Sequence, residues 1–293
     1  MNGALIVDKP AGLTSHDVVA RVRRLSGERS IGHLGTLDPG ATGVLPLLLG
    51  RLTRLARFFE SREKEYEGEI VFGQATTTYD AQGEAVGEPA ARVPEPAAVE
   101  AALAGLRGRI QQVPPPFSAK KVGGQRAYQL ARRQQPVRLA AVEVGVNEFT
   151  ITGWEGARAS FRVRCSSGTY VRSLAHDLGQ RVGTGAHLGR LRRTRVGEFG
   201  LALAVPLARL ESFQAADWPA ALVPARELLP EFPAVVAPRE AVAKILQGRA
   251  TNLPEFSSQP LIRVFAADAA LLAIARRLAG SLFQPQVVFP PQK

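Results

Sequence analysis

The sequence predicts an α+β fold, and three observations lead to this prediction. Segments with strand alternation and segments with helical spacing follow one another irregularly, which favours α+β over a doubly wound parallel sheet. The 293 residues are 45% hydrophobic and 22% charged, so the chain can bury a core. Prolines recur between residues 219 and 238, where the basic bias of the chain disappears. We therefore expect one domain over residues 1–230 and a smaller one over residues 231–293.

The first expected elements are a strand and a capped helix. Residues 4–7 are an apolar run typical of a strand. Thr14 and Asp17 have the spacing of a capping box, and valines continue at helical spacing until Gly27, where the helix should end. Residues 31–43 hold four glycines and a proline, so we expect an irregular loop there.

The middle of the chain mixes both kinds of element. Residues 67–72 are typical of a strand, and apolar residues from Val99 to Ile110 fall at helical spacing. Three successive prolines require an extended backbone over residues 112–117. Residues 161–165 alternate apolar and arginine side chains, which predicts a strand with a basic face. Helical spacing resumes at Val171, and Gly179 is the expected end of that helix.

Short apolar segments in the last part of the chain predict a small β-barrel. These segments are residues 235–236, 261–265, 271–275 and 287–289.

Basic residues are concentrated in two blocks of a chain whose formal net charge is +11. Residues 101–142 carry eight basic and no acidic side chains, and residues 158–197 carry nine basic and one acidic. Most are arginines, which bind phosphate with paired hydrogen bonds. We therefore rank nucleic acid above a merely solubilising surface as the explanation. An anionic membrane ranks third, because no basic amphipathic helix with aromatic anchors occurs in the sequence.

Cysteine and motif usage excludes several classes of protein. The single cysteine, Cys165, excludes an internal disulfide framework and multi-cysteine metal sites. The sequence contains no C-x-x-C, no H-E-x-x-H and no P-loop motif. The first residues lack a secretory pattern, and no apolar run has the length of a membrane span. We expect a cytoplasmic protein that does not bind a membrane.

The glycine-rich segment around Asp38 is the most unusual part of the sequence. An isolated Asp-Pro-Gly is more often a turn than an active site, but this one stands among four further blocks. The blocks are DKPAGLTS (8–15), GHLGTLDPGATGVLP (32–46), QVPPPFSAKK (112–121), GTYVRSLAHDLG (168–179) and AHLGRLRRTRVGEF (186–199). In content and order they resemble the bacterial TruB family, the tRNA pseudouridine-55 synthases, across roughly the first 200 residues.

The resemblance implies a fold and a reaction. The fold is a mixed, mainly antiparallel sheet flanked by helices with a central RNA cleft, followed by a PUA-like RNA-binding domain over residues 231–293. The reaction flips one uridine out of the tRNA T-loop, breaks its N1–C1′ bond and joins C5 to C1′. This isomerisation is redox-neutral and adds no atoms, so the resemblance implies no cofactor and no metal. It also implies tRNA as the partner of a monomer that requires no other protein.

The resemblance assigns catalytic roles to three residues. Asp38 matches the family nucleophile, which attacks either C1′ or the base C6. Arg172 matches the arginine that pairs with this aspartate, although by its own pattern it is also typical of a phosphate contact. Tyr66 matches the tyrosine that stacks on the target base and is proposed to take its C5 proton, although a core tyrosine fits its position equally well.

Five further residues match positions on the substrate side. His33 matches the histidine that fills the space left by the flipped nucleotides. Tyr170 and Leu191 match positions that line the uracil pocket. Lys9 and Lys120 are expected to support the fold around the cleft or to contact the RNA backbone.

One position departs from the family pattern: Thr77 stands where the family usually has an aspartate, while Asp80 is retained. The competing interpretations are a non-catalytic RNA chaperone or assembly factor with the same fold, and a guide-dependent, dyskerin-like synthase. A DNA glycosylase is more distant, because base flipping would suit it but the motifs do not.

Overall fold

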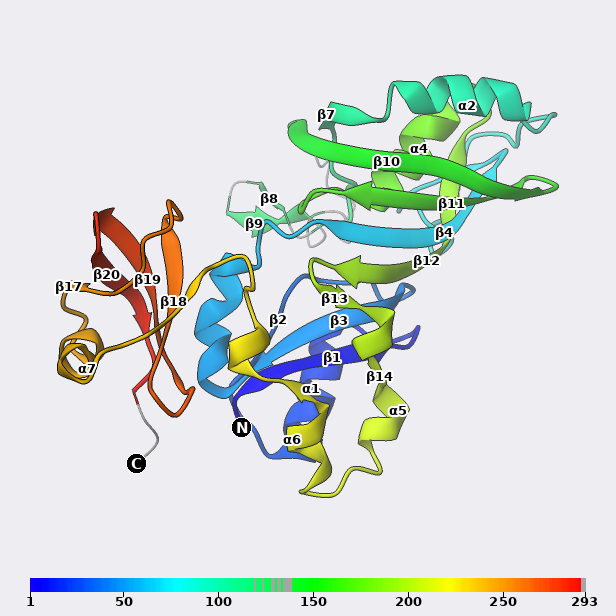
Figure 1. Cartoon of the computed structure of the whole chain (residues 1–293). Coiled ribbons are helices and arrows are strands. Elements are labelled where there is room, and N and C mark those ends of the chain that lie inside the picture. Colours follow the sequence, from blue (N-terminus) through cyan, green and yellow to red (C-terminus); the bar gives the residue numbers. More distant parts are fainter. Residues whose placement is uncertain (119, 123, 128–129, 131–132, 134–138, 291–293) are drawn as a thin grey trace.

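The protein is described by a computed structural model that covers residues 1–118, 120–122, 124–127, 130, 133 and 139–290. Within these residues, eleven strands form one large mixed sheet and five form a smaller sheet near the C-terminus. In Figure 1 the large sheet extends through the centre and right of the molecule, and the smaller sheet with helix α7 lies at the left. Together with the helices, these sheets confirm the expected α+β architecture.

The large sheet is mainly antiparallel, as expected. Its order is β14-β1-β3-β12-β4-β11-β10-β7, and only β1 with β14 and β3 with β12 pair in parallel. The strands of this path are β1 (Gly3–Lys9), β3 (Thr42–Leu49), β4 (Lys64–Phe72), β7 (Gly108–Gln112), β10 (Val142–Glu155), β11 (Arg158–Cys165), β12 (Ala186–Val196) and β14 (Val205–Pro206). Strands β2 (Ile31–His33), β13 (Phe199–Gly200) and β15 (Leu222–Val223) pair at its sides.

The predicted N-terminal strand and helix are both present. Strand β1 extends the apolar run to Lys9, and α1 spans Ser15–Ser26. Thr14 and Asp17 form the expected capping box, and Gly27 ends the helix in the left-handed conformation. The prediction of an irregular loop over residues 31–43 is partly wrong, because Ile31–His33 forms strand β2, which pairs antiparallel with β3. Within residues 31–43, only residues 34–41, which carry Asp38, lack regular structure.

Two helix ends differ from expectation. The helix expected from Val99 to Ile110 is α2 (Pro96–Ala104), and Ile110 lies in β7 opposite Val144. Its apolar spacing fits a helix, but Gly108 adopts a φ of +80° that starts a strand. Gly179 lies inside α4 (Val171–Arg181), where a Cβ would come within 2.1 Å of the backbone nitrogen of Ala186. This glycine therefore lets β12 pass close to the helix and does not end it.

The C-terminal sheet contains the predicted apolar segments except Phe289, which follows β20. Its order is β16-β18-β19-β20-β17, and it is packed against α7 (Arg239–Leu246). The strands are β16 (Ala234–Val236), β17 (Thr251–Asn252), β18 (Leu261–Phe265), β19 (Leu271–Ala279) and β20 (Leu282–Val288).

One apolar cluster joins this sheet to the rest of the molecule. It unites Ile6 and Val44 of the large sheet, Leu52 of η1 (Gly50–Phe58), and Phe265 and Ile274 of the small one. The two sheets therefore share a core, and a domain boundary near residue 231 stays a prediction.

The remaining elements are short. They are β5 (Ala75–Thr76), β6 (Ala85–Val86), β8 (Lys121–Val122), β9 (Gln125–Arg126), η2 (Leu201–Leu203), α5 (Leu207–Leu210), α6 (Asp217–Ala221) and η3 (Ala225–Glu227). Among the described helices, none combines the length and the apolar character needed to cross a membrane.

Candidate active site

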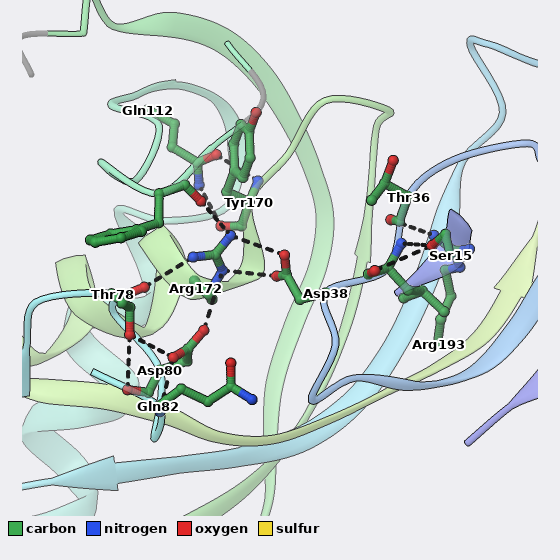
Figure 2. Close-up of polar contacts among 12 residues, drawn as sticks. Ser15, Thr36, Asp38, Thr78, Asp80, Gln82, Gln112, Tyr170, Arg172 and Arg193 are labelled. Atoms are coloured by element: carbon green, nitrogen blue, oxygen red, sulfur yellow. Dashed lines mark hydrogen bonds and ion pairs between the residues drawn. The ribbon is translucent and has the colours of Figure 1, made fainter. Parts of the chain in front are cut away.

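Asp38 lies in the loop between β2 and β3, and its carboxylate meets the guanidinium of Arg172 (Figure 2). Arg172 Nε is 2.9 Å from Asp38 Oδ2, and Nη2 donates to Oδ1 at 3.2 Å. The Asp38 side chain is 43% exposed while that of Arg172 is only 7% exposed. A reachable carboxylate thus rests in two-point contact on a buried cation, which fixes its orientation.

Three buried polar side chains hold the loop on both sides of Asp38. Lys9 Nζ donates to the carbonyls of Pro39 and Leu13, at 3.2 and 2.6 Å. Ser15 Oγ accepts from Leu37 N at 2.8 Å. Burial lowers the pKa of Lys9 to about 8, against the opposing charge of Asp38.

Arg193 is the third of these side chains and is completely buried. Its guanidinium donates to the carbonyls of Gly35, Thr36 and Val44, at 3.0, 3.3 and 2.8 Å. Asp38 itself begins a turn, since Ala41 N donates to its carbonyl at 3.0 Å. The Asp-Pro-Gly segment is therefore both a turn and the carrier of the exposed carboxylate.

Gly43 explains how the loop joins the sheet. It has a φ of +98°, and a Cβ there would lie 2.2 Å from the carbonyl oxygen of Arg193. Only glycine accepts both the left-handed backbone and this approach. Because β3 and β12 meet at this point, the loop stays in place relative to Arg193.

Arg172 lies in the first turn of α4, as its position in the sequence predicted. Besides Asp38, it donates to the carbonyls of Thr78 and Phe117, at 3.1 and 3.0 Å. Asp80 Oδ2 lies 3.7 Å from Arg172 Nε. The guanidinium is thus held by three separate segments of chain, which fits a fixed partner for Asp38 better than a mobile phosphate contact.

Tyr66 lies in β4 and pairs with Val163 on one side and Arg193 on the other. It is 6% exposed and belongs to the main apolar core. Burial raises the pKa of Tyr66, and the charge and hydrogen bonding of Arg193 oppose this shift. The geometry places Tyr66 as a core tyrosine beside the loop, and its role on a substrate base stays a prediction.

His33 and Tyr170 lie at the ends of elements. His33 is the last residue of β2 and is half-buried, and its Nδ1 has no hydrogen-bond partner among the described residues. Burial lowers the pKa of His33, and the nearby charge of Arg193 adds to this effect. Tyr170 occupies the N-cap position of α4. Its N–H donates to Oε1 of the buried Gln112 at 2.8 Å, and its carbonyl accepts from Gln112 Nε2 at 3.1 Å. Burial also raises the pKa of Tyr170.

Two further predicted residues are not among these contacts. Leu191 is in β12 and packs partly buried against the main core. Lys120 is exposed just before β8. The remaining predicted residue, Lys9, is buried and contacts the loop described above, so it supports the fold and does not face solvent.

Thr77, the position that departs from the family pattern, is exposed and accepts a hydrogen bond from Glu84 N at 3.1 Å. It stabilises its own turn. In this turn, the carboxylate that lies near Arg172 belongs to Asp80 and not to the residue at position 77. Asp80 Oδ1 also accepts from Thr78 Oγ1 at 2.6 Å.

Sequence reasoning missed Arg193, Ser15 and Gln112 as parts of this site. Arg193 is one of nine basic residues in its block, and charged residues are rarely buried, so nothing in the pattern singles it out. Ser15 is the last residue of the DKPAGLTS block. Its position directly after the Thr14 cap is the one local signal, because it sets the side chain at the helix start beside the loop.

The basic face predicted for β11 is largely neutralised by neighbouring acidic residues. Arg162 Nη2 is 2.9 Å from Glu67, and Arg164 Nε is 3.4 Å from Glu63. Arg158 and Arg190 both contact Glu69, which is nearly buried. The alternation was correctly predicted, but these cations are matched by the acidic residues of β4 and its start and do not form a free basic surface.

Comparisons with known proteins agree with this architecture. Residues 23–171 match the family described as "TruB family pseudouridylate synthase (N terminal domain)", and residues 172–232 match the "tRNA pseudouridylate synthase B C-terminal domain". A protein named tRNA pseudouridine synthase B from Solibacter usitatus is 47% identical over 98% of this chain and 100% of its own. One of the same name from Thermobifida fusca is 47% identical over 98% of each chain.

Solved structures show the same fold. A chain from the "Structure of H/ACA RNP bound to a substrate RNA containing 2'-deoxyuridine" superposes with a TM-score of 0.72 at 25% identity, covering 99% of this chain and 85% of that one. A chain of the archaeal box H/ACA sRNP Nop10-Cbf5 complex gives 0.71 at 25% identity, covering 99% and 86%. The α+β pseudouridine-synthase fold is thereby confirmed, and the chain belongs to the TruB family of pseudouridylate synthases.

Proposed function

We propose that the protein converts the uridine at position 55 of the tRNA T-loop into pseudouridine, with Asp38 as the attacking group. Conversion of a uridine in tRNA is the activity that the family and the names of the full-length relatives indicate. The observation that carries the proposal is the exposed carboxylate of Asp38, held by the buried guanidinium of Arg172 at 2.9 Å. Neighbouring backbone atoms of its loop are also held, so the carboxylate is oriented before any substrate binds.

The proposed reaction uses this geometry. The Asp38 carboxylate adds to C1′ or to C6 of the flipped uridine, and the N1–C1′ bond breaks. The base turns, C5 bonds to C1′, the adduct with Asp38 is released, and the C5 proton leaves as N1 gains one. Nothing is oxidised or reduced, so no electron acceptor enters the scheme. Arg172 keeps the carboxylate directed at the substrate during these steps.

Tyr66 is our candidate for the C5 proton step. Tyr66 pairs with Arg193 across β4 and β12, and the positive charge of Arg193 counteracts the increase in the pKa of Tyr66 that burial causes. His33 ends β2 just before the loop, Tyr170 precedes Arg172, and the carbonyl of Leu191 accepts from Thr42 at the end of the loop. These positions make the three residues our candidates to line the uracil site and to fill the space that the flipped base leaves. Lys9 acts by holding the loop, and Lys120 offers a cation to the RNA backbone.

The whole chain is proposed to act as a monomer on naked tRNA in the cytoplasm, without a required protein partner. Residues 231–293 are proposed as a small RNA-binding unit, because their sheet is separate from the large one although the two share a core. The second candidate function is guide-dependent modification. The fold similarity to chains of H/ACA complexes favours it, whereas the relatives at 47% identity favour tRNA as the direct substrate.

The test is to map pseudouridine in an unmodified tRNA transcript incubated with the protein alone. We expect one new pseudouridine at position 55 with the wild type and none with Asp38→Asn. Modification only after a guide RNA is added would select the second candidate. If the wild type binds tRNA but forms no pseudouridine with or without a guide RNA, both enzymatic functions are rejected. That result would favour the non-catalytic RNA chaperone.

A further inference from the structure

The segment that supports Arg172 makes a second contact with helix α4, through two aromatic side chains. Tyr79 stacks on His176 with ring centroids 3.8 Å apart and planes 9° from parallel. Arg172 and His176 are four residues apart on α4, so they share one face of the helix. The loop between β5 and β6 therefore contacts this face at two points, Arg172 and His176.

The backbone of Tyr79 is strained. Its φ of +65° lies in the left-handed region, which a bulky side chain rarely adopts. Such a conformation persists only where the surroundings hold it. Leu188 N donates to the Tyr79 carbonyl at 3.0 Å, and Ala81 N donates to the Leu188 carbonyl at 2.9 Å. Strand β12 thus holds one side of this segment, and the ring stack on α4 holds the other.

The residues on both sides of Tyr79 both contact Arg172. The carbonyl of Thr78 accepts from Arg172 Nη1 at 3.1 Å, and Asp80 Oδ2 lies 3.7 Å from Nε. Figure 2 shows Thr78 across the guanidinium from Asp38, whereas Asp80 approaches Nε, the nitrogen that Asp38 also contacts. The left-handed bend at Tyr79 is what directs a carbonyl before it and a carboxylate after it toward the same cation.

We propose that the Tyr79–His176 stack is a positioning device for the Asp38–Arg172 pair. The stack holds the bend at Tyr79, the bend holds Thr78 and Asp80 against Arg172, and Arg172 then directs the Asp38 carboxylate. Tyr79 and His176 are positioning residues that act through Arg172. The inference rests on the proposed function of Asp38 and extends it to two residues that the family blocks do not include in the chemistry.

The test compares three substitutions of Tyr79 by single-turnover rate, tRNA affinity and thermal stability. Tyr79→Phe keeps the ring and is expected to stay within about twofold of the wild-type rate. Tyr79→Ala and Tyr79→Gly remove the ring and are expected to slow the reaction about tenfold, with affinity within about twofold. Glycine also relieves the backbone strain, so Tyr79→Gly should be more stable than Tyr79→Ala and yet equally slow.

A second arm tests whether His176 belongs to the same unit. His176→Ala should slow the reaction as much as Tyr79→Ala, and the double variant should be no slower than either single one. In NMR spectra the ring protons of His176 should be shifted upfield by the stacked ring in the wild type and in Tyr79→Phe, and should lose that shift in Tyr79→Ala.

The matched control is Trp154→Ala, which removes another stacked pair, Phe72 with Trp154 at 5.6 Å, on a different part of the sheet. It should lower stability and leave the rate unchanged. A wild-type rate in Tyr79→Gly, or additive losses in the double variant, would overturn the inference. Where the wild type is active and Asp38→Asn is not, either of these two results counts only against the role of the stack. An inactive wild type would instead count against the proposed function.

Discussion

At the scale of single residues, the site consists of one exposed carboxylate, Asp38, and several buried side chains that hold it and its loop in place. Asp38 could be selected as the candidate nucleophile from the sequence because the glycine-rich block around it is specific. Lys9 and Arg193 could not be placed in the same way. Their side chains are fully buried on backbone carbonyls, and the sequence pattern of a charged residue gives no sign of such partners.

Removing the Arg193 side chain should therefore destabilise the whole protein. Arg193→Met keeps most of the volume but leaves the carbonyls of Gly35, Thr36 and Val44 without their donor. At about 1–3 kcal/mol for each buried group, we expect a loss of at least about 3 kcal/mol in the free energy of unfolding. Urea denaturation measures it. Arg192→Met is the control, since Arg192 is half-exposed and pairs with Asp8, and it should cost less than about 1 kcal/mol.

Tyr66 allows the two roles of a buried tyrosine to be separated. Tyr66→Phe keeps the buried ring and its packing but lacks the hydroxyl. We expect the single-turnover rate to fall about a hundredfold or more, while tRNA affinity stays within about twofold. Rate and affinity are measured on the same tRNA transcript. Turnover at the wild-type level would remove the proton-transfer role and leave Tyr66 as a core residue.

At the scale of elements, helix ends were predicted correctly where capping residues next to the helix determine them. The capping box of α1 and its terminal Gly27 were both predicted, because caps act within a few residues. The end of α2 was not, because the apolar spacing continues through Ile110 into a strand. Gly179 was misinterpreted for a related reason. Its role depends on the approach of β12, a tertiary contact that sequence spacing does not reveal.

Helix α4 carries a carboxyl group that should make its stability depend on pH. Burial raises the pKa of Asp177 from 3.8 to about 6, with Arg181 opposing the shift. The folded protein thus holds this proton more tightly than the unfolded chain. The resulting stability is complete below about pH 4 and is lost as the pH rises through about 6.

Asp177→Asn should remove this dependence. Because the side chain is partly exposed, we expect a gain of about 1 kcal/mol in the free energy of unfolding at about pH 7.5 and none at about pH 4. Thermal unfolding at both pH values measures it. An equal gain at the two values would show that Asp177 is not the titrating group.

At the scale of the whole molecule, composition indicated the class of partner but not the surface that meets it. The net charge of +11 and the arginine-rich blocks point to a polyanion. Several of those arginines are nevertheless matched by Glu63, Glu67 and Glu69 across the sheet. Charge counted along the sequence cannot reveal such pairing, because the partners come from strands about ninety residues apart in the chain.

Salt dependence of tRNA binding tests this view. If about six to eight phosphates are neutralised, the logarithm of affinity should fall with the logarithm of salt concentration with a slope of about −4 to −7. The double substitution Arg162→Gln and Arg164→Gln should leave the slope within about one of the wild-type value, because those arginines are already paired. A slope smaller by about two would mean that both contact phosphate.

The central claim is that the Asp38 carboxylate, held by Arg172, attacks the flipped nucleoside. The most direct measurement is tritium release from tRNA labelled at C5 of uridine, under single-turnover conditions, with wild type and Asp38→Asn. Asparagine keeps the shape and most of the loop contacts, so we expect unchanged tRNA affinity and a rate at least about ten-thousandfold lower. Release by Asp38→Asn at a rate near that of the wild type would contradict the claim.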